Sequence, residues 1–277
     1  DIAVLTSPVF DQSSPTCQLS FWYHMYGNGI GTMQVILRQG NQDTQLFRRI
    51  GGQGNRWNSM IIGLGQLRAP FQILFEATRS FSVRGDIALD DINFINCELP
   101  PTEDSCTADQ LRCTRGSCVG LDRVCDYTDD CGDGTDEAPN QCANIPDRCD
   151  FQNGICSWTQ FGGDNFSWSR RAGCTPTGNT GPCRDHTTNT DAGYYLYIEA
   201  SNRNNGAFAR VASRIFAGTT GSTNPCTLRF YYHMYGNNIG SLAVKMRTTY
   251  GGPLTQIWAR TAQVGNYWER AEITIQS

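Results

Sequence analysis

Short, largely apolar segments bounded by polar and glycine-rich turns recur along the chain and predict β-strands. They are rich in aromatic and β-branched side chains and include residues 18–24 (QLSFWYH), 33–38 (MQVILR), 71–78 (FQILFEAT) and 86–95 (DIALDDINFI). Turn-forming clusters separate them, at residues 27–31 (GNGIG), 51–55 (GGQGN) and 82–85 (SVRG). No long segment shows the helical period of 3.6 residues. The pattern predicts an all-β chain folded as a sandwich or jelly roll.

One of these strands occurs twice. Residues 17–31 read CQLSFWYHMYGNGIG and residues 226–240 read CTLRFYYHMYGNNIG, at an offset of 209. Further along, QLFRRIGGQGNRW ends at Trp57 and QIWARTAQVGNYW ends at Trp268, at an offset of 211. Because the match is long and nearly in register, the chain is expected to contain two copies of one domain. The matched regions are residues 4–66 and 210–277.

The repeated strand carries bulky side chains on both faces. Alternate residues point to opposite sides of a strand. The two sets are Phe21, Tyr23 and Met25 on one side and Trp22, His24 and Tyr26 on the other. This predicts a central strand that is buried on both faces. His24 and its equivalent, His233, are expected to be buried, hydrogen-bonded strand residues, since no Cys, His or carboxylate lies beside them at metal-ligand spacing.

Charge and cysteine content set the middle of the chain apart. Residues 103–147 hold eleven acidic and three basic residues, a net charge of −8, whereas the whole chain carries −4. A strongly basic nucleic-acid footprint is therefore absent. Thirteen cysteines indicate an oxidising compartment. No apolar run approaches the ~18 residues of a membrane span, and no signal peptide is visible. With the glycosylation sequon at Asn165, these features predict extracellular or cell-surface material.

Residues 106–142 contain six cysteines in 37 residues, too short a stretch to build a hydrophobic core. The cysteines allow 15 pairings, among which spacing alone does not choose. Within this module, residues 125–137 (CDYTDDCGDGTDE) are rich in carboxylates, among which Asp126, Asp130, Asp136 and Glu137 are the candidate ligands. Such an oxygen-rich cluster suits calcium. The spacing of these carboxylates is close to that of an EF-hand calcium loop. Because Cys131 replaces the turn glycine of such a loop, disulfides must hold this one in place. The alternative is a solvated acidic loop that binds no ion.

This module resembles the LDL-receptor class A repeats, through its six cysteines and the D-x-x-x-D-C-x-D-G-T-D-E signature. The resemblance implies the disulfides Cys106–Cys118, Cys113–Cys131 and Cys125–Cys142. It also implies one calcium ion, held by the side chains of Asp126, Asp130, Asp136 and Glu137 and by the carbonyl oxygens of Arg123 and Thr128. Asp133 matches a position that orders the loop. Ligand-binding members place an aromatic residue at position 123, where an arginine would repel a partner's lysine, which favours a spacer role.

The flanking regions resemble MAM domains. The stretches that carry this resemblance are CDFQNGICSWTQFGGDNFSWSR from Cys149, GDIALDDINF at 85–94, DHT at 185–187 and GYYLYIEA at 193–200. The resemblance implies extracellular β-sandwich domains of adhesion and receptor proteins. It divides the chain into the C-terminal part of one MAM domain (1–98), a class A module (103–143) and the N-terminal part of a second MAM domain (148–277).

The repeat register adds expectations about the remaining cysteines. The equivalent of Cys97 would fall at position 308, so the chain is expected to begin inside one MAM domain and end inside another. The expected disulfides are Cys17–Cys97, Cys149–Cys156 and Cys174–Cys183. Cys226, the equivalent of Cys17, is expected to have its partner beyond Ser277.

Three further groups of residues outside the class A module are candidate functional sites. Some MAM domains carry a cation near acidic residues, for which the candidates here are Asp90, Asp91, Asp150 and Asp185, with Gln152 in place of a common glutamate. Arg84-Gly85-Asp86 spells an integrin-binding tripeptide, but it opens a predicted strand and is expected to be poorly exposed. His186 is expected to be structural. No G-x-S-x-G, H-E-x-x-H or P-loop motif occurs.

Together these features predict a non-catalytic extracellular adhesion or structural segment of a tandem MAM and class A array. The class A module would be a calcium-stabilised spacer or interaction site between proline-containing linkers at 98–101 and 143–146. Its partners are expected to be proteins, with self-association through the MAM domains. The alternatives are a ligand-binding ectodomain segment of a signalling or endocytic receptor, or a non-catalytic region of a secreted mosaic protease.

Overall fold

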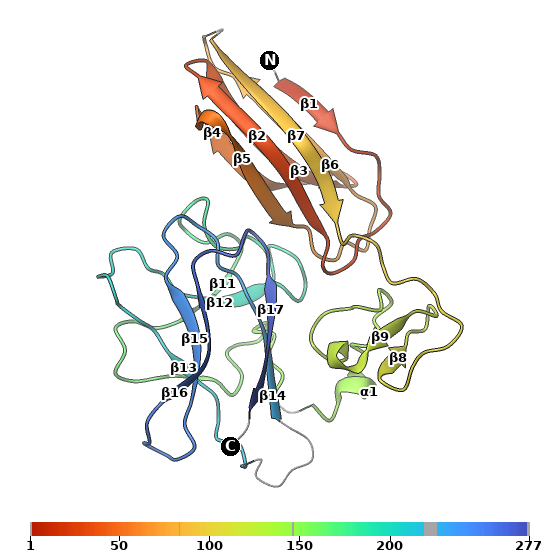
Figure 1. The fold of residues 1–277 in the computed structure, drawn as a ribbon, viewed down its shortest axis with the longest axis vertical. Coiled ribbons are helices and arrows are strands. Elements are labelled where there is room, and N and C mark those ends of the chain that lie inside the picture. The colour runs from red at the N-terminus through yellow and green to blue at the C-terminus, as the bar shows by residue number, and fades with distance from the viewer. Residues whose placement is uncertain (1, 83, 146, 219–225, 276–277) are drawn as a thin grey trace. The chain divides into compact units, whose positions relative to one another are not determined.

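The computed structural model describes residues 2–82, 84–145, 147–218 and 226–275. Val83 of the predicted 82–85 turn, Pro146 of the second linker and the final residue, Ser277, lie outside the described residues. The chain forms two compact units, Asp1–Gln141 with Gly265–Tyr267, and Cys142–Val264 with Trp268–Ser277. Almost every regular element is a strand (Figure 1), so the predicted all-β class is confirmed.

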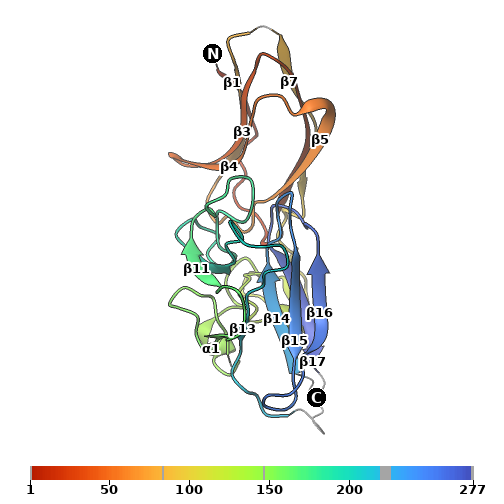
Figure 2. The ribbon, with the colours of Figure 1, turned by 90° about the vertical axis from the view of Figure 1, so that its left-hand side faces the viewer.

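The first copy of the repeat is a sandwich of seven strands. They are β1 (Ile2–Thr6), β2 (Gln18–Gly27), β3 (Ile30–Gln39), β4 (Gln42–Ile50), β5 (Gly54–Gly63), β6 (Gln72–Arg79) and β7 (Gly85–Ile95). They form two antiparallel sheets with the orders β1-β6-β3-β4 and β5-β2-β7. Figure 2 shows the two layers edge-on. A disulfide between Cys17 and Cys97 joins the segment before β2 to the segment after β7.

The core of this sandwich follows the predicted alternation on one face only. Phe21, Tyr23 and Met25 are all buried, and Phe21 packs edge-on against Phe75 with ring centroids 5.0 Å apart. On the opposite face of β2, Trp22 is 40% exposed and Tyr26 is 54% exposed. The prediction of burial on both faces is therefore wrong for this copy. The reason is that β2 is central within its sheet, whereas the sandwich covers only the inner face of that sheet.

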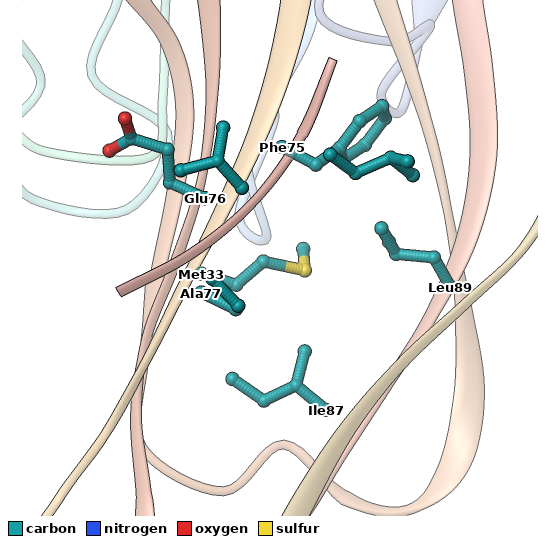
Figure 3. A pocket seen from close by; sticks show the side chains of 9 residues that line it. Met33, Phe75, Glu76, Ala77, Ile87 and Leu89 are labelled. Atoms are coloured by element: carbon teal, nitrogen blue, oxygen red, sulfur yellow. The ribbon is translucent and has the colours of Figure 1, made fainter. Parts of the chain in front are cut away.

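A small pocket opens between the two sheets beside β1. Its lining is apolar except for Glu76 and comprises Ala3, Val4, Leu5, Met33, Phe75, Glu76, Ala77, Ile87 and Leu89 (Figure 3). The side chains shown there offer no nucleophile or base other than one carboxylate, so the pocket is part of the packing of the sandwich.

The tight turn between β2 and β3 explains why glycine recurs in the repeated string. Gly27 has a φ of 121°, a conformation that residues with a Cβ rarely adopt. A Cβ at this position would lie 2.5 Å from the carbonyl oxygen of Arg84. Only glycine lets the start of β7 approach the turn this closely.

The class A module contains little regular structure. Its elements are β8 (Gln110–Arg112), β9 (Cys118–Gly120), the single 3₁₀ turn η1 (Leu121–Arg123) and α1 (Pro139–Cys142). The buried cluster consists of Cys113, Val119 and Cys131, with Leu111 packed against it. Disulfides join Cys106 to Cys118 and Cys113 to Cys131, and Cys125 and Cys142 are also disulfide-bonded. The module is thus held by cross-links rather than by apolar area, as its length requires.

The second copy is built from short antiparallel pairs. Its strands are β10 (Thr159–Gln160), β11 (Ser169–Ala172), β12 (Tyr194–Tyr197), β13 (Val211–Ala212), β14 (Cys226–Tyr232), β15 (Ser241–Met246), β16 (Thr255–Thr261) and β17 (Glu269–Ile275). The pairs are β10–β13, β11–β12, β14–β17 and β15–β16. The buried cluster of Tyr232, Met234 and Ala271 packs against partly buried side chains that include Phe230 and Trp258.

The cysteines of the second copy form two local loops. Disulfides join Cys149 to Cys156 and Cys174 to Cys183, across seven and nine residues of sequence. Cys226 is a free cysteine of intermediate exposure.

Candidate functional site

The acidic segment of the class A module is closed on itself by main-chain contacts. The N–H of Cys125 donates to the carbonyl oxygen of Asp136 at 3.1 Å, which brings the two ends of the segment together. Cys125 and Tyr127 adopt positive φ angles of 60° and 70°, and Gly132 and Gly134 both have a φ of 75°. These left-handed residues bend the chain into a compact loop without regular structure.

The carboxylates predicted as ligands lie inside this loop. Asp126 and Asp136 are buried, Asp136 completely, whereas Asp130 and Glu137 are half-buried. The N–H of Asp130 donates to Oδ2 of Asp136 at 2.8 Å, and the N–H of Thr128 donates to Oδ1 of Asp126 at 3.0 Å. The structure thus brings three of the predicted acidic residues into one hydrogen-bonded loop.

The two residues predicted to offer carbonyl oxygens differ in their surroundings. Thr128 is buried, and its carbonyl accepts the N–H of Asp130 at 3.0 Å. Arg123 is half-buried and ends the η1 turn, with its Nε 3.7 Å from Oδ2 of Asp122. Arg123 therefore neutralises part of the surface charge next to the loop.

The chemistry of the donor set fits a hard divalent cation. Burial raises the pKa of Asp136 to about 6, while main-chain hydrogen bonds act in the opposite direction and the charge of Asp129 adds to the increase. A buried carboxylate group of this kind is costly to ionise unless a cation compensates it. Among the described residues, no three His, Cys, Asp or Glu side chains are arranged to hold a metal ion by themselves. The Asp126 and Asp136 carboxylates accept N–H groups of the loop.

Asp129, which was not among the predicted ligands, lies at the centre of a second set of contacts. Its side chain is 4% exposed, and Oδ1 accepts the N–H of Gly134 at 2.8 Å. Oδ2 accepts Nη2 of Arg68 at 2.7 Å and Nε2 of Gln66 at 3.0 Å. The adjacency of Asp129 to Asp130 was the only available signal, because Arg68 and Gln66 lie more than sixty residues away in sequence.

Asp133 belongs to the same loop and keeps its expected ordering contacts. Its carboxylate accepts the N–H of Arg115 at 2.6 Å and the N–H of Thr135 at 3.0 Å. Although burial acts to raise it, these hydrogen bonds lower the pKa of Asp133 below its usual value. The carboxylate thus stays ionised and ties the loop to the preceding hairpin.

The acidic candidates of the MAM regions fall into separate places. Asp185 is buried and accepts the N–H of Thr188 at 2.8 Å and Nε2 of Gln152 at 3.1 Å. Asp150, which is half-buried, accepts the N–H of Gln152 at 3.0 Å. Protein donors therefore occupy the Asp185 carboxylate, with the Gln152 amide among them. Asp90 and Asp91 are exposed on β7 of the other copy.

The histidines occupy three aromatic environments. His24 is half-buried rather than buried, because it lies on the outer face of β2, and its Nε2 lies 3.1 Å from Oδ1 of Asn55. His233 packs against Trp268 with ring centroids 5.6 Å apart. His186 stacks on Tyr231 with centroids 3.4 Å apart, and burial lowers its pKa to about 3. Each histidine thus has at least one aromatic or amide neighbour.

Two surface candidates can also be located. Arg84 and Asp86 are exposed and Gly85 opens β7, so the expectation that the tripeptide is poorly exposed is wrong for its two charged residues. They are exposed because β7 lies at the edge of its sheet. Asn165 is exposed too, and its Oδ1 accepts the N–H of Phe208 at 3.0 Å.

Comparisons with known proteins identify both kinds of module. The model of the MAM domain (meprin/A5/mu) matches residues 1–106 and 149–277, and that of the low-density lipoprotein receptor domain class A matches residues 104–142. Within the described residues, no helix is long and apolar enough to cross a membrane.

Curated relatives match about half of the chain. Human MAM domain-containing protein 2 is 41% identical over 128 residues, which cover 46% of this chain and 18% of that protein. Human MAM domain-containing glycosylphosphatidylinositol anchor protein 1 is 37% identical over 145 residues, which cover 50% of this chain and 15% of that protein. The chain thus spans less than a fifth of the length of these relatives. Since the MAM model matches most of its residues, the chain belongs to the MAM domain family, with one class A module between its two MAM regions.

Proposed function

We propose that this chain is a non-catalytic extracellular adhesion or structural segment in which a calcium-stabilised class A module separates two MAM domains. The observation that carries the proposal is the closed acidic loop, in which Asp136 is fully buried next to Asp130. The disulfides and the names of the relatives, which include a glycosylphosphatidylinositol anchor protein, support an extracellular or cell-surface location.

One calcium ion would be held by the side chains of Asp126, Asp130, Asp136 and Glu137 and by the carbonyl oxygens of Arg123 and Thr128. When bound, the ion would compensate carboxylates that otherwise repel one another. The chain's own contribution is to pre-position the loop, through the Cys125 to Asp136 main-chain bond and the disulfides on either side. Because binding and loop order are coupled, calcium would act on the stability of the module.

The surroundings of the loop favour a spacer over a lysine-binding site. Arg123 adds a positive charge at the edge of the loop, which repels a partner's ammonium group. Asp129 is occupied by Arg68 and Gln66 of the same chain. Association with protein partners, including further copies of the chain, would then fall to the MAM domains, and the exposed Asn165 would carry a glycan.

The test is the mass distribution of the full chain over a range of concentrations, with millimolar calcium and then with chelator. Calcium-sensitive oligomers that grow with concentration are expected for a self-associating array. A strict monomer in both conditions would refute self-association and favour a receptor segment that recognises another molecule.

A further inference from the structure

Two arginines and three aromatic rings of the second copy alternate in a continuous stack. Arg210 has its guanidinium carbon 4.4 Å from the ring centre of Phe208 and 5.6 Å from that of Phe161. Arg247 lies 5.6 Å from the same Phe161 ring and 5.5 Å from the ring of Tyr250. Phe161 is thus shared by both cations. The cation ladder, as we call it, consists of Phe208, Arg210, Phe161, Arg247 and Tyr250.

The ladder faces solvent along most of its length. Tyr250 is 88% exposed and Phe208 is 40% exposed, while Arg247 is exposed and Arg210 is half-buried. Each guanidinium carbon lies within about 6 Å of two ring centres, a distance at which cation–π attraction restrains the side chain. Both arginines are therefore ordered cations on an accessible surface.

Neither guanidinium has a carboxylate partner within the described part of the chain. The nearest acidic contact involves Asp164, whose Oδ2 accepts the main-chain N–H of Arg210 at 2.7 Å rather than its side chain. Comparison of the two copies shows why Arg247 is unpaired. Its equivalent, Arg38, at an offset of 209, forms a two-pronged bond to Asp43, with both N to O distances 2.7 Å.

The second copy has lost that partner. Asp43 lies directly across the hairpin from Arg38 in the β3–β4 register. At the offset of 211 that holds beyond the turn, the residue equivalent to Asp43 is Leu254. Leu254 lies one step beyond the Met246–Thr255 pair, across the hairpin from Arg247. The same strand position therefore carries an arginine paired with a carboxylate in the first copy (Arg38) and an arginine opposite a leucine in the second copy (Arg247).

Such an arrangement suits a polymer with repeated anionic groups. A guanidinium edge binds a sulfate or carboxylate through two parallel N–H bonds, and stacking leaves that edge free. The exposed ring of Tyr250 at the end of the ladder offers apolar surface to the C–H face of a sugar ring. In an extracellular setting the abundant polyanions of this kind are sulfated polysaccharides.

We propose that the cation ladder is a binding site for a sulfated polysaccharide. This goes beyond the proposed spacer role and does not depend on calcium, because no residue of the ladder belongs to the class A loop. Recognition is expected to be electrostatic at the two guanidinium groups, with Phe161 and Tyr250 setting the spacing between anionic groups.

The test is binding of the full chain to a heparin octasaccharide at low and physiological salt, by calorimetry or surface plasmon resonance. The variant Arg210→Gln with Arg247→Gln is expected to weaken binding at least tenfold. Leu254→Asp, which restores the partner found in the first copy, is expected to weaken it several-fold while keeping both arginines. Arg38→Gln and Asn41→Asp are the matched controls in the first copy and should leave affinity unchanged.

Four outcomes would overturn the proposal. The first three are no measurable binding at low salt, equal binding of a desulfated octasaccharide, and equal losses in the control variants, which would indicate general charge attraction. Variants that bind normally but lose self-association would also overturn it, in favour of the acidic class A module as the ladder's partner. Circular dichroism of each variant checks that the fold is retained. Repeating the binding in chelator separates this site from the proposed calcium loop.

Discussion

The main-chain N–H of Asp130 donates a hydrogen bond to Oδ2 of Asp136 at 2.8 Å, and this bond links the middle of the acidic loop to its end. One proposed ligand thereby orients another before any ion arrives. The loop is closed, yet it contains a fully buried carboxyl group whose ionisation needs compensation.

Asp136→Asn is therefore expected to abolish calcium-dependent order in residues 106–142. The amide removes the buried charge that calcium would neutralise and leaves one fewer anionic oxygen. Hydrogen exchange of the full chain with and without calcium measures the effect. Asp104→Asn, at an exposed position outside the loop, is the control. If chelator leaves exchange in the unmodified module unchanged, the calcium proposal is wrong.

Acidification is expected to weaken calcium binding. Burial raises the pKa of Asp136 to about 6 without metal, so below that pH a proton occupies the carboxylate and competes with the ion. Affinity at pH 5 should then be about tenfold lower than at pH 7. With chelator, acidification is expected to stabilise the module instead. A carboxyl group whose pKa is raised by folding stabilises the folded state below pH ~4, and this stabilisation is lost as the pH rises towards 6. Calcium titrations and denaturant melts at pH 4, 5 and 7 distinguish the two effects.

The contact of Asp129 with Arg68 predicts an asymmetric pair of variants. Asp129→Ala removes a buried acceptor and leaves the N–H of Gly134 without its bond, which should cost about 1–3 kcal/mol. Arg68 has a side chain that is 68% exposed, so Arg68→Gln should cost less than about 1 kcal/mol. Urea unfolding of the class A module, followed by hydrogen exchange, reports both values. Equal costs would mean that Asp129 matters only through its ion pair.

The partly buried His186 predicts that the second copy is sensitive to acid. Burial lowers the pKa of His186 to about 3, so the folded state favours the neutral ring. The stability that this ring contributes is fully present above pH ~6.5. That stability is lost progressively as pH falls from 6.5 towards 3, by about 2 kcal/mol at pH 5. Thermal unfolding of the full chain from pH 7.5 to 5 measures the slope. His186→Phe keeps a stacking ring on Tyr231 and should flatten the profile, whereas an unchanged slope would assign the acid sensitivity elsewhere.

The sequence was sufficient for the modules and for the inner face of the repeated strand. Period-two alternation placed Phe21, Tyr23 and Met25 together, because a strand must turn alternate residues to one side. Cysteine number and spacing marked the class A module, since a segment so short requires cross-links.

Other features depend on contacts that local patterns do not contain. Trp22 and Tyr26 look like core residues, yet their exposure is decided by which layers cover the sheet. Asp129 resembles its acidic neighbours until Arg68 and Gln66 are brought to it by the fold. The availability of Arg247 depends on the identity of Leu254 across a hairpin, which becomes informative only when compared with Arg38 and Asp43.

The Cys17–Cys97 disulfide has a mechanical consequence. Cys97 follows the end of β7 and precedes the linker at 98–101, while Cys17 precedes the central strand β2. Gln18 and Ile95 are paired at this end of the sheet. Tension applied through the linker would otherwise peel the edge strand β7 away one hydrogen bond at a time. The covalent bond passes that load to the central strand, so the sandwich must yield by shearing several strands together rather than by unzipping.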